Sequence, residues 1–427
     1  MSTIDGYADT NRDYFTTCLS MRLIFVNHVH PQTPHVGGLR AYKFALEGVK
    51  KGHRVILICE ALNSSPYTPS LKELRNLLES HDWSEPLILG IRPFRSFILE
   101  QIRHKKVIPA IRKVLVTWSY LVNSGVFTDF SSAVKAYIEP IVDMFRPDLC
   151  WGIFGNTDAW LVAQKIACFA RIPWVADVKD GWDPFIPKPL RNILARRFYD
   201  AKAMTANSQY QAELTMHWFP HKPVVVYSGV DDFFIYEKNF SDDLKRPRIT
   251  LVGSTYSQEN LERFIYGIRI WAKKRPFGST RPIFVYAGGE VERVRLAARV
   301  LEDVCDFELY GYLPLKELFE ICSRSLVNAY IWSPKTFHHK LIELICCGRP
   351  IIAFPGERKE AFQLANEAGA QFYECVSEEH LSNTLKRIEK TGASQVLVKN
   401  REVRKRFSWT AQAEILFEVF TEAVRRS

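Results

Sequence analysis

The chain has 427 residues, which is too long for one compact core and suits two domains of ordinary size. Its content of 47% hydrophobic and 24% charged residues, without low-complexity tracts or internal repeats, is that of a soluble globular protein and argues against a fibrous or disordered chain. The net charge is +10, no run approaches the roughly 20 apolar residues that cross a bilayer, and no secretory signal opens the sequence, so we expect a cytoplasmic protein.

The first half of the chain alternates short apolar strands with helical stretches. Its opening unit is predicted as strand, Gly-rich loop, helix and strand over residues 21–27, 28–38, 39–51 and 54–59. This order predicts a right-handed βαβ unit. Further apolar strands are predicted at residues 149–154, 174–177, 203–207 and 224–228. We therefore expect a parallel sheet that is covered by helices on both faces.

A stretch that mixes basic and apolar residues lies within this half, over residues 92–113. It contains a single acidic residue, Glu100. Its basic residues are Arg92, Arg95, Arg103, Lys105, Lys106, Arg112 and Lys113. Such a stretch could lie on an anionic membrane surface, to which each basic residue contributes on the order of 1 kcal/mol. It equally fits a solvated helix face whose apolar side packs in the core. Nucleic acid is not expected as a partner, because no nucleic-acid-binding motif accompanies the charge.

The second half repeats the alternation. Domain boundaries are predicted by composition, as a polar leader over 1–20, a first domain over 21–232, a polar linker over 233–247, a second domain over 248–407 and a closing amphipathic helix over 408–427. Strands of the second domain are predicted at 248–254, 283–289, 307–313, 326–332 and 349–354. Two doubly wound α/β halves predict a crevice between them, with ligands at the carboxyl ends of the strands.

Loops that follow strands are therefore the candidate binding segments. Gly37 and Gly38 end the first such loop, where a missing Cβ lets backbone N–H groups approach a phosphate or a sugar. Gly253, Ser254 and Thr255 form the corresponding loop of the second half, with hydroxyls suited to phosphate oxygens, although a plain helix N-cap would look the same. No G-x-G-x-x-G string occurs, which argues against a nicotinamide or flavin oxidoreductase.

Charged and aromatic side chains follow another predicted strand, at Asp177, Asp180 and Trp182. A loop of this kind suits sugar hydroxyls and an acid or base role, and an Asx-type turn is the alternative. The carboxylates do not form a D-x-D pattern, so no metal ion is predicted. His35, in the first loop, is a further candidate at this edge, without zinc-type spacing around it.

The most informative segment runs from His339 to Phe354. It places Lys340 and Glu343 on the first turn of a short apolar helix that ends at Gly348 and leads into a buried strand. A helix N-terminus has unpaired N–H groups and a partial positive charge that suit a diphosphate, and Lys340 adds a full charge. Glu343 can accept hydrogen bonds from two ribose hydroxyls. The segment predicts a nucleotide site, although a solvated Lys–Glu pair on an ordinary helix fits the same pattern.

Four strings in this order resemble retaining glycosyltransferases of GT-B fold, close to glycosyltransferase family 4. They are HVGGLRAYKFALEGVKKGHRVILIC, WVADVKDGW, VVYSGVDDFF and KLIELICCGRPIIAF, and the resemblance runs from about Met21 to the C-terminus. It implies two Rossmann-like domains, the first holding an acceptor and the second a nucleotide-sugar donor, with the final helix packing back on the first domain. It also implies transfer with retention of configuration, without a metal ion or a cofactor.

The resemblance also implies roles for single residues. Glu343 matches the second Glu of the family's E-x7-E motif and would bind the donor ribose. The first Glu of that motif is absent, and Lys335 occupies its position. Lys340 resembles the Lys of a K-x-x-E form and would neutralise the leaving diphosphate. The donor site is thus expected to comprise Gly253, Ser254, Thr255, Lys335, His339, Lys340, Leu341 and Glu343. The acceptor or phosphate loops are expected to contribute His35, Gly37, Gly38, Asp177 and Trp182, with Asp180 and Lys340 as catalytic groups.

The predicted activity is transfer of a sugar from a nucleotide sugar to an acceptor hydroxyl, in surface polysaccharide or glycolipid biosynthesis. Asp180 or an oxygen of the leaving phosphate would take the acceptor proton. A lipid-linked glycan at the cytosolic membrane face is the preferred acceptor because of residues 92–113, and a small soluble aglycone is the alternative. Two other functions fit the sequence: a nucleotide-sugar epimerase of the same architecture and a catalytically silent partner subunit.

Overall fold

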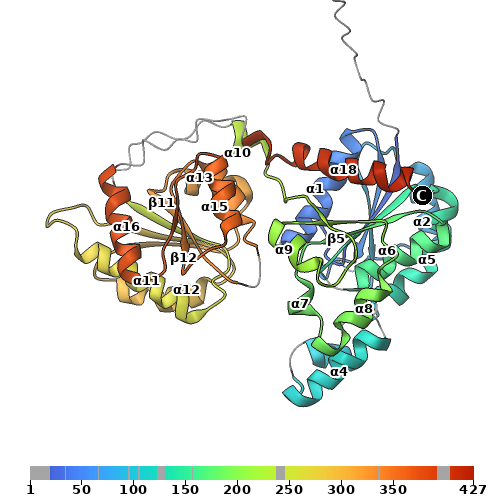
Figure 1. Cartoon of the computed structure of the whole chain (residues 1–427), viewed down its shortest axis with the longest axis horizontal. Helices are drawn as coiled ribbons and strands as arrows, with labels where there is room; N and C mark the ends of the chain where they lie inside the picture. The colour runs from blue at the N-terminus through green and yellow to red at the C-terminus, as the bar shows by residue number, and fades with distance from the viewer. Residues whose placement is uncertain are drawn as a thin grey trace, which may run out of the picture.

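The computed structural model describes residues 20–33, 35–65, 67–94, 97–103, 106–122, 130–155, 157–236, 246–334, 337–391 and 404–427. They form two domains that lie side by side, each built on one parallel sheet with helices on both faces (Figure 1). The predicted α/β class with two doubly wound halves is thereby confirmed.

The first domain contains a seven-stranded sheet in the order β3-β2-β1-β4-β5-β6-β7. Its strands are β1 (Arg22–Val26), β2 (Arg54–Glu60), β3 (Leu87–Ile91), β4 (Leu149–Ile153), β5 (Trp174–Val178), β6 (Ala203–Ala206) and β7 (Val224–Val225). Its helices are α1 (Val36–Lys50), α2 (Leu71–Ser80), α3 (Phe97–Arg103), α4 (Pro109–Val122), α5 (Phe130–Phe145), α6 (Thr157–Ala170), α7 (Trp182–Phe185), α8 (Arg191–Arg197) and α9 (Gln209–Thr215). The winding direction reverses between β1 and β4, which places a ligand-accepting crevice at their carboxyl ends.

The second domain contains a six-stranded sheet in the order β10-β9-β8-β11-β12-β13. Its strands are β8 (Arg248–Val252), β9 (Ile283–Ala287), β10 (Asp306–Tyr310), β11 (Val327–Ile331), β12 (Ile351–Phe354) and β13 (Phe372–Glu374). Its helices are α11 (Gln258–Lys273), α12 (Val291–Ala298), α13 (Leu315–Ser323), α14 (Lys340–Cys347), α15 (Lys359–Glu367) and α16 (Glu378–Thr391). Here the reversal lies between β8 and β11.

Strand β1 shows why the central strands form continuous apolar runs. Successive side chains of a strand point to opposite faces of the sheet. Leu23 and Phe25 accordingly join the hydrophobic cluster on one face, and Ile24 and Val26 join the cluster on the other. All four are fully buried. A strand covered on both faces therefore needs apolar residues at every position, which is the pattern seen in the sequence.

The last helix, α18 (Trp409–Arg425), returns to the first domain and packs along α1 (Figure 1). The ring centres of Trp409 and Phe44 lie 5.3 Å apart, and those of Phe420 and Phe25 lie 5.9 Å apart. Ser408 caps the helix by accepting from the N–H of Ala411 at 3.0 Å. The predicted closing helix and its packing against the first domain are confirmed.

The structure adds two strands to the predicted ones and gives detail at a predicted domain boundary. The edge strands β3 and β13 were not predicted. The predicted domain boundary at residue 232 falls at the start of α10 (Asp232–Tyr236), where Phe234 and Ile235 are already buried in a cluster with α14. The expected linker at 233–247 lies partly outside the described residues, as does the leader over 1–20.

One carboxylate joins the two domains. Glu360, at the start of α15, accepts hydrogen bonds from the backbone N–H groups of Gln209 and Tyr210 at 2.6 and 3.0 Å, and from the hydroxyl of Tyr227 at 2.8 Å. The two N–H groups belong to the first turn of α9, where a negative charge is favoured by the helix dipole. Beside it, the guanidinium of Arg358 lies 3.4 Å from the ring centre of Tyr210. Glu360 is buried, so this contact fixes the approach of the domains.

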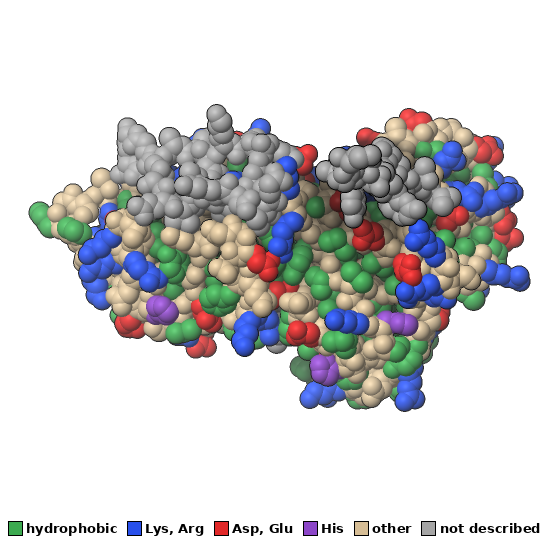
Figure 2. All heavy atoms as spheres, turned by 45° about the horizontal axis from the view of Figure 1, so that its top comes forward, with side chains coloured by type: hydrophobic (Ala, Val, Ile, Leu, Met, Phe, Trp, Pro, Cys, Tyr) green, Lys and Arg blue, Asp and Glu red, His purple; other side chains and the backbone are tan. Residues whose placement is uncertain are grey.

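Basic and acidic side chains are mixed on one face of the molecule (Figure 2). Figure 2 shows Lys and Arg side chains over both domains on the face that it presents, with acidic side chains among them. In the described ranges, no helix combines the length and the hydropathy needed to span a bilayer.

Replacement of Glu360 tests the domain junction. We expect Glu360→Gln to lower the free energy of unfolding by about 1–3 kcal/mol, because the amide gives up charge-assisted hydrogen bonds at a buried helix N-terminus. Urea denaturation would measure this loss, and X-ray scattering would show a larger radius of gyration. Glu367→Gln on the same helix is the control, since Glu367 forms a half-exposed pair with Arg406. Equal stability of the two variants would contradict the junction's role.

Candidate functional site

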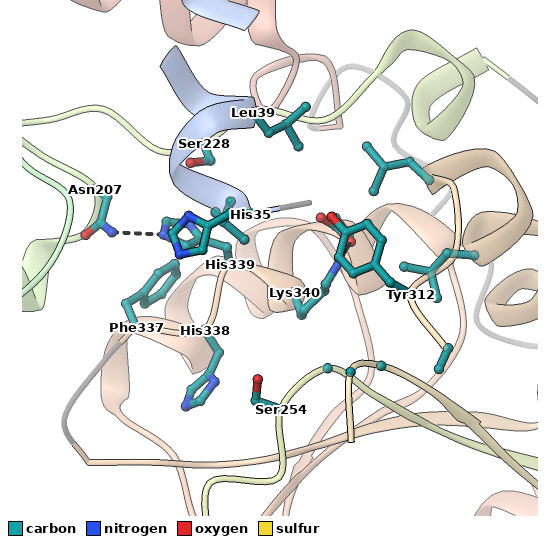
Figure 3. Close-up of a pocket in the computed structure, with 18 of the residues that line it drawn as sticks. His35, Leu39, Asn207, Ser228, Ser254, Tyr312, Phe337, His338, His339 and Lys340 are labelled. Atoms are coloured by element: carbon teal, nitrogen blue, oxygen red, sulfur yellow. Dashed lines mark hydrogen bonds and ion pairs between the residues drawn. The ribbon is translucent and has the colours of Figure 1, made fainter. Parts of the chain in front are cut away.

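A cavity of about 460 Å³ lies between the domains, where the carboxyl ends of both sheets face each other. Residues from the loops after β1, β5 and β8, and from the start of α14, contribute to its wall. The predicted site residues that line it are His35, Asp180, Gly253, Ser254, His339, Lys340 and Glu343. Figure 3 shows Lys340 and Tyr312 beside one another, opposite His35 and His339. The chain therefore brings together half of the predicted residues, from segments about 300 residues apart in the sequence.

Lys340 and Glu343 form an ion pair on the first turn of α14, with Nζ and Oε2 2.7 Å apart. Both side chains are partly buried, at 27% and 17% exposure. Burial lowers the pKa of Lys340, but the adjacent Glu343 carboxylate outweighs it and the net shift is upward. Lys340 is therefore charged at neutral pH and is positioned at the cavity wall by its neighbour.

The helix N-terminus itself differs from the expectation. The N–H groups of Leu341 and Ile342 donate to the carbonyls of His338 and His339 at 3.0 and 3.1 Å, in a tight turn that precedes the helix. These two amides are therefore already satisfied and do not face a ligand with free hydrogens. The side chain of Leu341 is fully buried in the core of the second domain. Positive charge at this end of the cavity thus rests mainly on Lys340.

The loops after β8 and β9 approach Lys340 with backbone rather than side chains. Gly253 adopts a φ of 84°, in the left-handed region that favours glycine, and a Cβ on it would lie 3.7 Å from Cγ of Lys340. A Cβ on Gly288 would lie 2.6 Å from the carbonyl oxygen of Gly253, so only glycine fits there. Thr255 points elsewhere, because its N–H and hydroxyl both donate to Glu290 at 2.6 and 3.0 Å. Ser254 and Tyr256 are the hydroxyl-bearing residues of this loop that line the cavity.

Gly37 and Gly38 make room for protein atoms. A Cβ on Gly38 would lie 2.7 Å from the carbonyl oxygen of His30, and one on Gly37 would lie 3.1 Å from Nζ of Lys179. His35 caps α1, its Nδ1 accepting from the N–H of Gly37 at 3.0 Å. The two glycines thus let the start of α1 pack against its own loop, while His35 is the group of this loop that lines the cavity.

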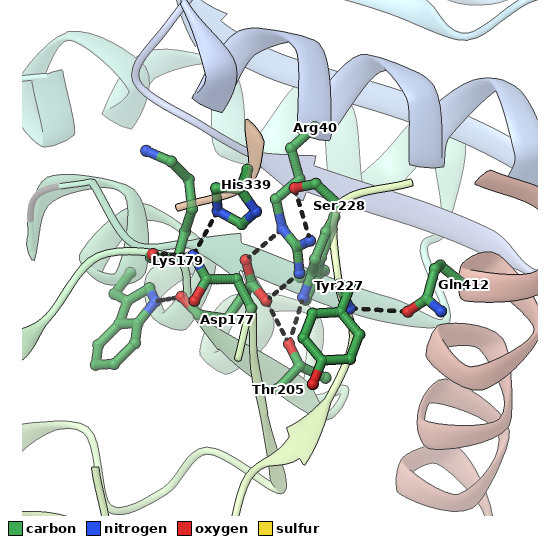
Figure 4. A network of polar contacts seen from close by, with 11 residues as sticks. Arg40, Asp177, Lys179, Thr205, Tyr227, Ser228, His339 and Gln412 are labelled. Carbon is green, nitrogen blue, oxygen red and sulfur yellow. Dashed lines mark hydrogen bonds and ion pairs between the residues drawn. The ribbon is translucent and has the colours of Figure 1, made fainter. Parts of the chain in front are cut away.

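Two predicted residues, one near the end of β5 and one in the segment that follows it, lie away from the cavity. Asp177 is fully buried and accepts from Arg40 at 2.9 and 3.1 Å and from the hydroxyl of Thr205 at 2.7 Å (Figure 4). Trp182 is buried in the core, where its ring stacks on Trp160 with the centroids 5.8 Å apart. Both residues support the loop from below. Lys335 lies outside the described residues.

Lys179 is a cavity residue that the sequence pattern did not single out. It is buried, at 6% exposure, and its Nζ lies 2.7 Å from Oδ2 of Asp180. Together with Lys340 it gives the described part of the cavity a cation on each domain. A buried cation with one carboxylate partner retains hydrogens for an anionic or hydroxylic ligand.

Neutral histidines with unused hydrogen-bonding atoms lie in the wall, as His339 does, and near it, as His28 does close to Lys179 and Asp180. Burial and the nearby cations lower the pKa of both His28 and His339 to about 3, so both rings are uncharged at neutral pH. Nε2 of His339 lies 2.9 Å from the amide nitrogen of Asn207, across the domain boundary. Nδ1 of each histidine and Oδ1 of Asn207 are buried without a partner. Such atoms are costly unless water or a bound molecule pairs with them, which makes this corner a candidate for ligand contacts.

A titratable pair lies behind the cavity. The hydroxyl of Tyr330 donates to Oε2 of Glu357 at 2.5 Å, and the Tyr330 ring lies 5.2 Å from His338 in the cavity wall. Burial raises the pKa of Glu357 to about 7, against smaller opposing effects of Tyr330 and Arg358.

Comparisons with known proteins concern the fold. The sequence matches no protein-family model and no curated relative. HepE from Anabaena, solved in complex with UDP and glucose, is 17% identical and superposes with a TM-score of 0.60 over 94% of this chain and 100% of that one. Sucrose-phosphate synthase from Thermosynechococcus elongatus is 15% identical, with a TM-score of 0.66 over 95% and 100% of the two chains.

A putative UDP-N-acetylglucosamine 2-epimerase from Listeria monocytogenes has the same arrangement, with 12% identity and a TM-score of 0.55 over 96% of this chain and 98% of that one. Identities of this size show the fold alone. The chain thus has the predicted GT-B architecture, with two Rossmann-like domains facing a central crevice.

The protonation of Glu357 gives a pH prediction. Because its pKa is higher in the folded than in the unfolded chain, the folded state binds more protons between about pH 4.5 and 7. The stability that Glu357 contributes is therefore complete below that window and is lost as the pH rises through it, by up to about 3 kcal/mol. The buried neutral histidines His28 and His339 act in the opposite direction over this pH range, so the Glu357 effect is measured as a difference between two proteins. In urea denaturation at pH 5 and pH 8, the stability of the wild type should rise less, or fall more, between the two pH values than that of Glu357→Gln. The exposed Glu379→Gln is the control, and an unchanged pH difference in Glu357→Gln would refute the assignment.

Proposed function

We propose that the protein is a retaining glycosyltransferase that binds a nucleotide-diphosphate sugar in the cavity between its domains. The observation that carries the proposal is the Lys340–Glu343 pair, which lies at the cavity wall on the domain that would hold the donor. It is supported by the GT-B fold that the chain shares with HepE, a protein solved in complex with UDP and glucose.

The donor would lie against the second domain. Lys340 and the Ser254 hydroxyl would contact the diphosphate, and the close backbone of Gly253 leaves room for its oxygens. Glu343 would accept the two ribose hydroxyls. Preorganised cations at the position where negative charge develops stabilise the departing diphosphate, so this donor site needs no metal ion in our proposal.

The acceptor would lie against the first domain, near Asp180 and His35. The bond between the anomeric carbon and the diphosphate oxygen breaks, and the acceptor oxygen bonds to that carbon on the same face. The acceptor proton passes to Asp180 or to an oxygen of the leaving phosphate. Lys179 holds Asp180 at 2.7 Å and keeps that carboxylate at the cavity edge. Membership of glycosyltransferase family 4, a cytoplasmic location and a role in surface polysaccharide or glycolipid synthesis are parts of this proposal.

Nucleotide-sugar epimerisation is the second candidate, because a putative epimerase superposes on nearly the whole chain. An epimerase would turn over a nucleotide sugar without any acceptor. Incubation with a panel of nucleotide sugars, with and without acceptor glycans, separates the two functions. Product that forms equally in the absence of an acceptor would establish the epimerase. A silent subunit would show no turnover, and calorimetry would show whether it binds nucleotide diphosphates.

Removal of the Lys340 ammonium tests the donor site. We expect Lys340→Ala to lower turnover about a hundredfold, which is the effect of roughly 3 kcal/mol of lost charge stabilisation in the transition state. Nucleotide diphosphate binding, measured by calorimetry, should weaken as well. Lys359→Ala is the matched control, since Lys359 is an exposed lysine at the start of α15 in the same domain. Unchanged turnover and binding in Lys340→Ala would refute the site.

A further inference from the structure

Helix α4 exposes a row of apolar side chains that the proposed transferase does not use. Its members recur at intervals of three and four residues, so they share one helix face, and each is between 47% and 68% exposed. They are Ile111, Val114, Trp118, Leu121 and Val122. The other side of the helix packs on the domain core through Leu115, Val116 and Tyr120, and the Tyr120 hydroxyl donates to the carbonyl of Phe185 at 3.0 Å. The helix is thus anchored on one side and apolar towards solvent on the other.

The apolar row continues onto the preceding segments. Phe94, Phe97, Ile98 and Ile108 are exposed as well, and Phe97 reaches 76%. Helix α3, which carries two of them, packs against α4. We call these four residues and the row on α4 the α4 patch. Large exposed apolar side chains that gather on neighbouring segments mark a candidate surface for binding a partner.

The charged residues around the α4 patch are mostly basic. Helix α4 contains no acidic residue, and Glu100 is the acidic residue of α3. Lys106, which precedes α4, and Lys113, in its second turn, are exposed. Arg112 donates through Nε to the carbonyl of Ile102 at 3.2 Å. The patch therefore combines apolar side chains with exposed ammonium groups, which is complementary to an interface that is apolar inside and anionic outside.

The position of α4 makes the patch accessible. Figure 1 shows α4 standing out from the first domain, on the side opposite α18 and away from the second domain. The patch follows a projecting helix rather than a groove. A projecting helix can enter the headgroup layer of a bilayer, where the indole of Trp118 has a favourable place between apolar and hydrated regions.

We propose that the α4 patch binds the surface of a bilayer that contains anionic lipids. The row from Ile111 to Val122 lies at the boundary of headgroups and acyl chains, and Lys106 and Lys113 lie at the level of the lipid phosphates. This surface goes beyond the proposed transferase activity. It would bring the first domain, which we assign to the acceptor, next to acceptors that are linked to lipids.

Sedimentation with vesicles tests the proposal on the full chain without any donor. The protein should sediment with vesicles of phosphatidylglycerol and phosphatidylcholine at low ionic strength, and much less with phosphatidylcholine alone or at high salt. Lys106→Gln with Lys113→Gln should weaken partitioning about fivefold per lysine. Trp118→Ser with Leu121→Ser should weaken it about tenfold or more, because both side chains then lose their apolar contact.

Matched controls lie on the second domain. Lys274→Gln and Phe277→Ser alter an exposed lysine and a fully exposed phenylalanine there, and both should bind vesicles like the wild type. The proposal is overturned if the wild type stays in the supernatant with anionic vesicles at low ionic strength, or if the α4 variants bind as it does. It is also overturned if light scattering shows a dimer that Trp118→Ser with Leu121→Ser dissociates, since the patch would then join two copies of the chain. Donor binding is measured separately without vesicles, so failure of either proposal is distinguishable from failure of the other.

Discussion

The buried ion pair between Arg40 and Asp177 is the interaction on which the wall of the first domain depends. Both side chains are fully buried, and Asp177 also accepts from Thr205 while Arg40 donates to Ser228 at 3.3 Å. The pair thereby joins α1 to β5, β6 and the segment after β7 at the carboxyl end of the sheet. Two desolvated charges are stable only when both remain, and loss of one partner in such a pair typically costs about 3–5 kcal/mol. The positions of His35 at the start of α1 and of Asp180 after β5 follow from this contact.

The cavity exists because two such domains meet at the carboxyl ends of their sheets. Neither domain alone contains a complete site, since cations, hydroxyls and glycine backbones come from both. Glu360 of the second domain accepts hydrogen bonds from the first turn of α9 in the first domain. Asn207 of the first domain contacts His339, which precedes α14 in the second. An apolar contact accompanies these polar ones, since the rings of Tyr227 and Phe337 lie 5.8 Å apart across the junction. The geometry of the site is therefore tied to the angle between the domains.

The sequence predicted the central strands and the closing helix because burial on both faces imposes long apolar runs and a helical period. It missed β3 and β13, which are edge strands and therefore under less demand for continuous apolar residues. It identified the segment of Asp177 and Asp180 but could not separate their roles, because the partner that buries Asp177 is 137 residues away. The burial of Lys179 and the turn that satisfies the amides of Leu341 and Ile342 are likewise tertiary features without a local sequence signal.

The mutual contact of Lys340 and Glu343 also affects selectivity. The ammonium and the carboxylate neutralise one another in this pair, so the wall does not act as a general trap for small anions. Inorganic phosphate would have to compete with Glu343 for the lysine and would leave that carboxylate without compensation. A molecule that carries an anionic group and two neighbouring hydroxyls at the right separation satisfies both residues at once. The pair therefore discriminates by requiring two functional groups in one ligand, which disfavours the free phosphate that is abundant in cells.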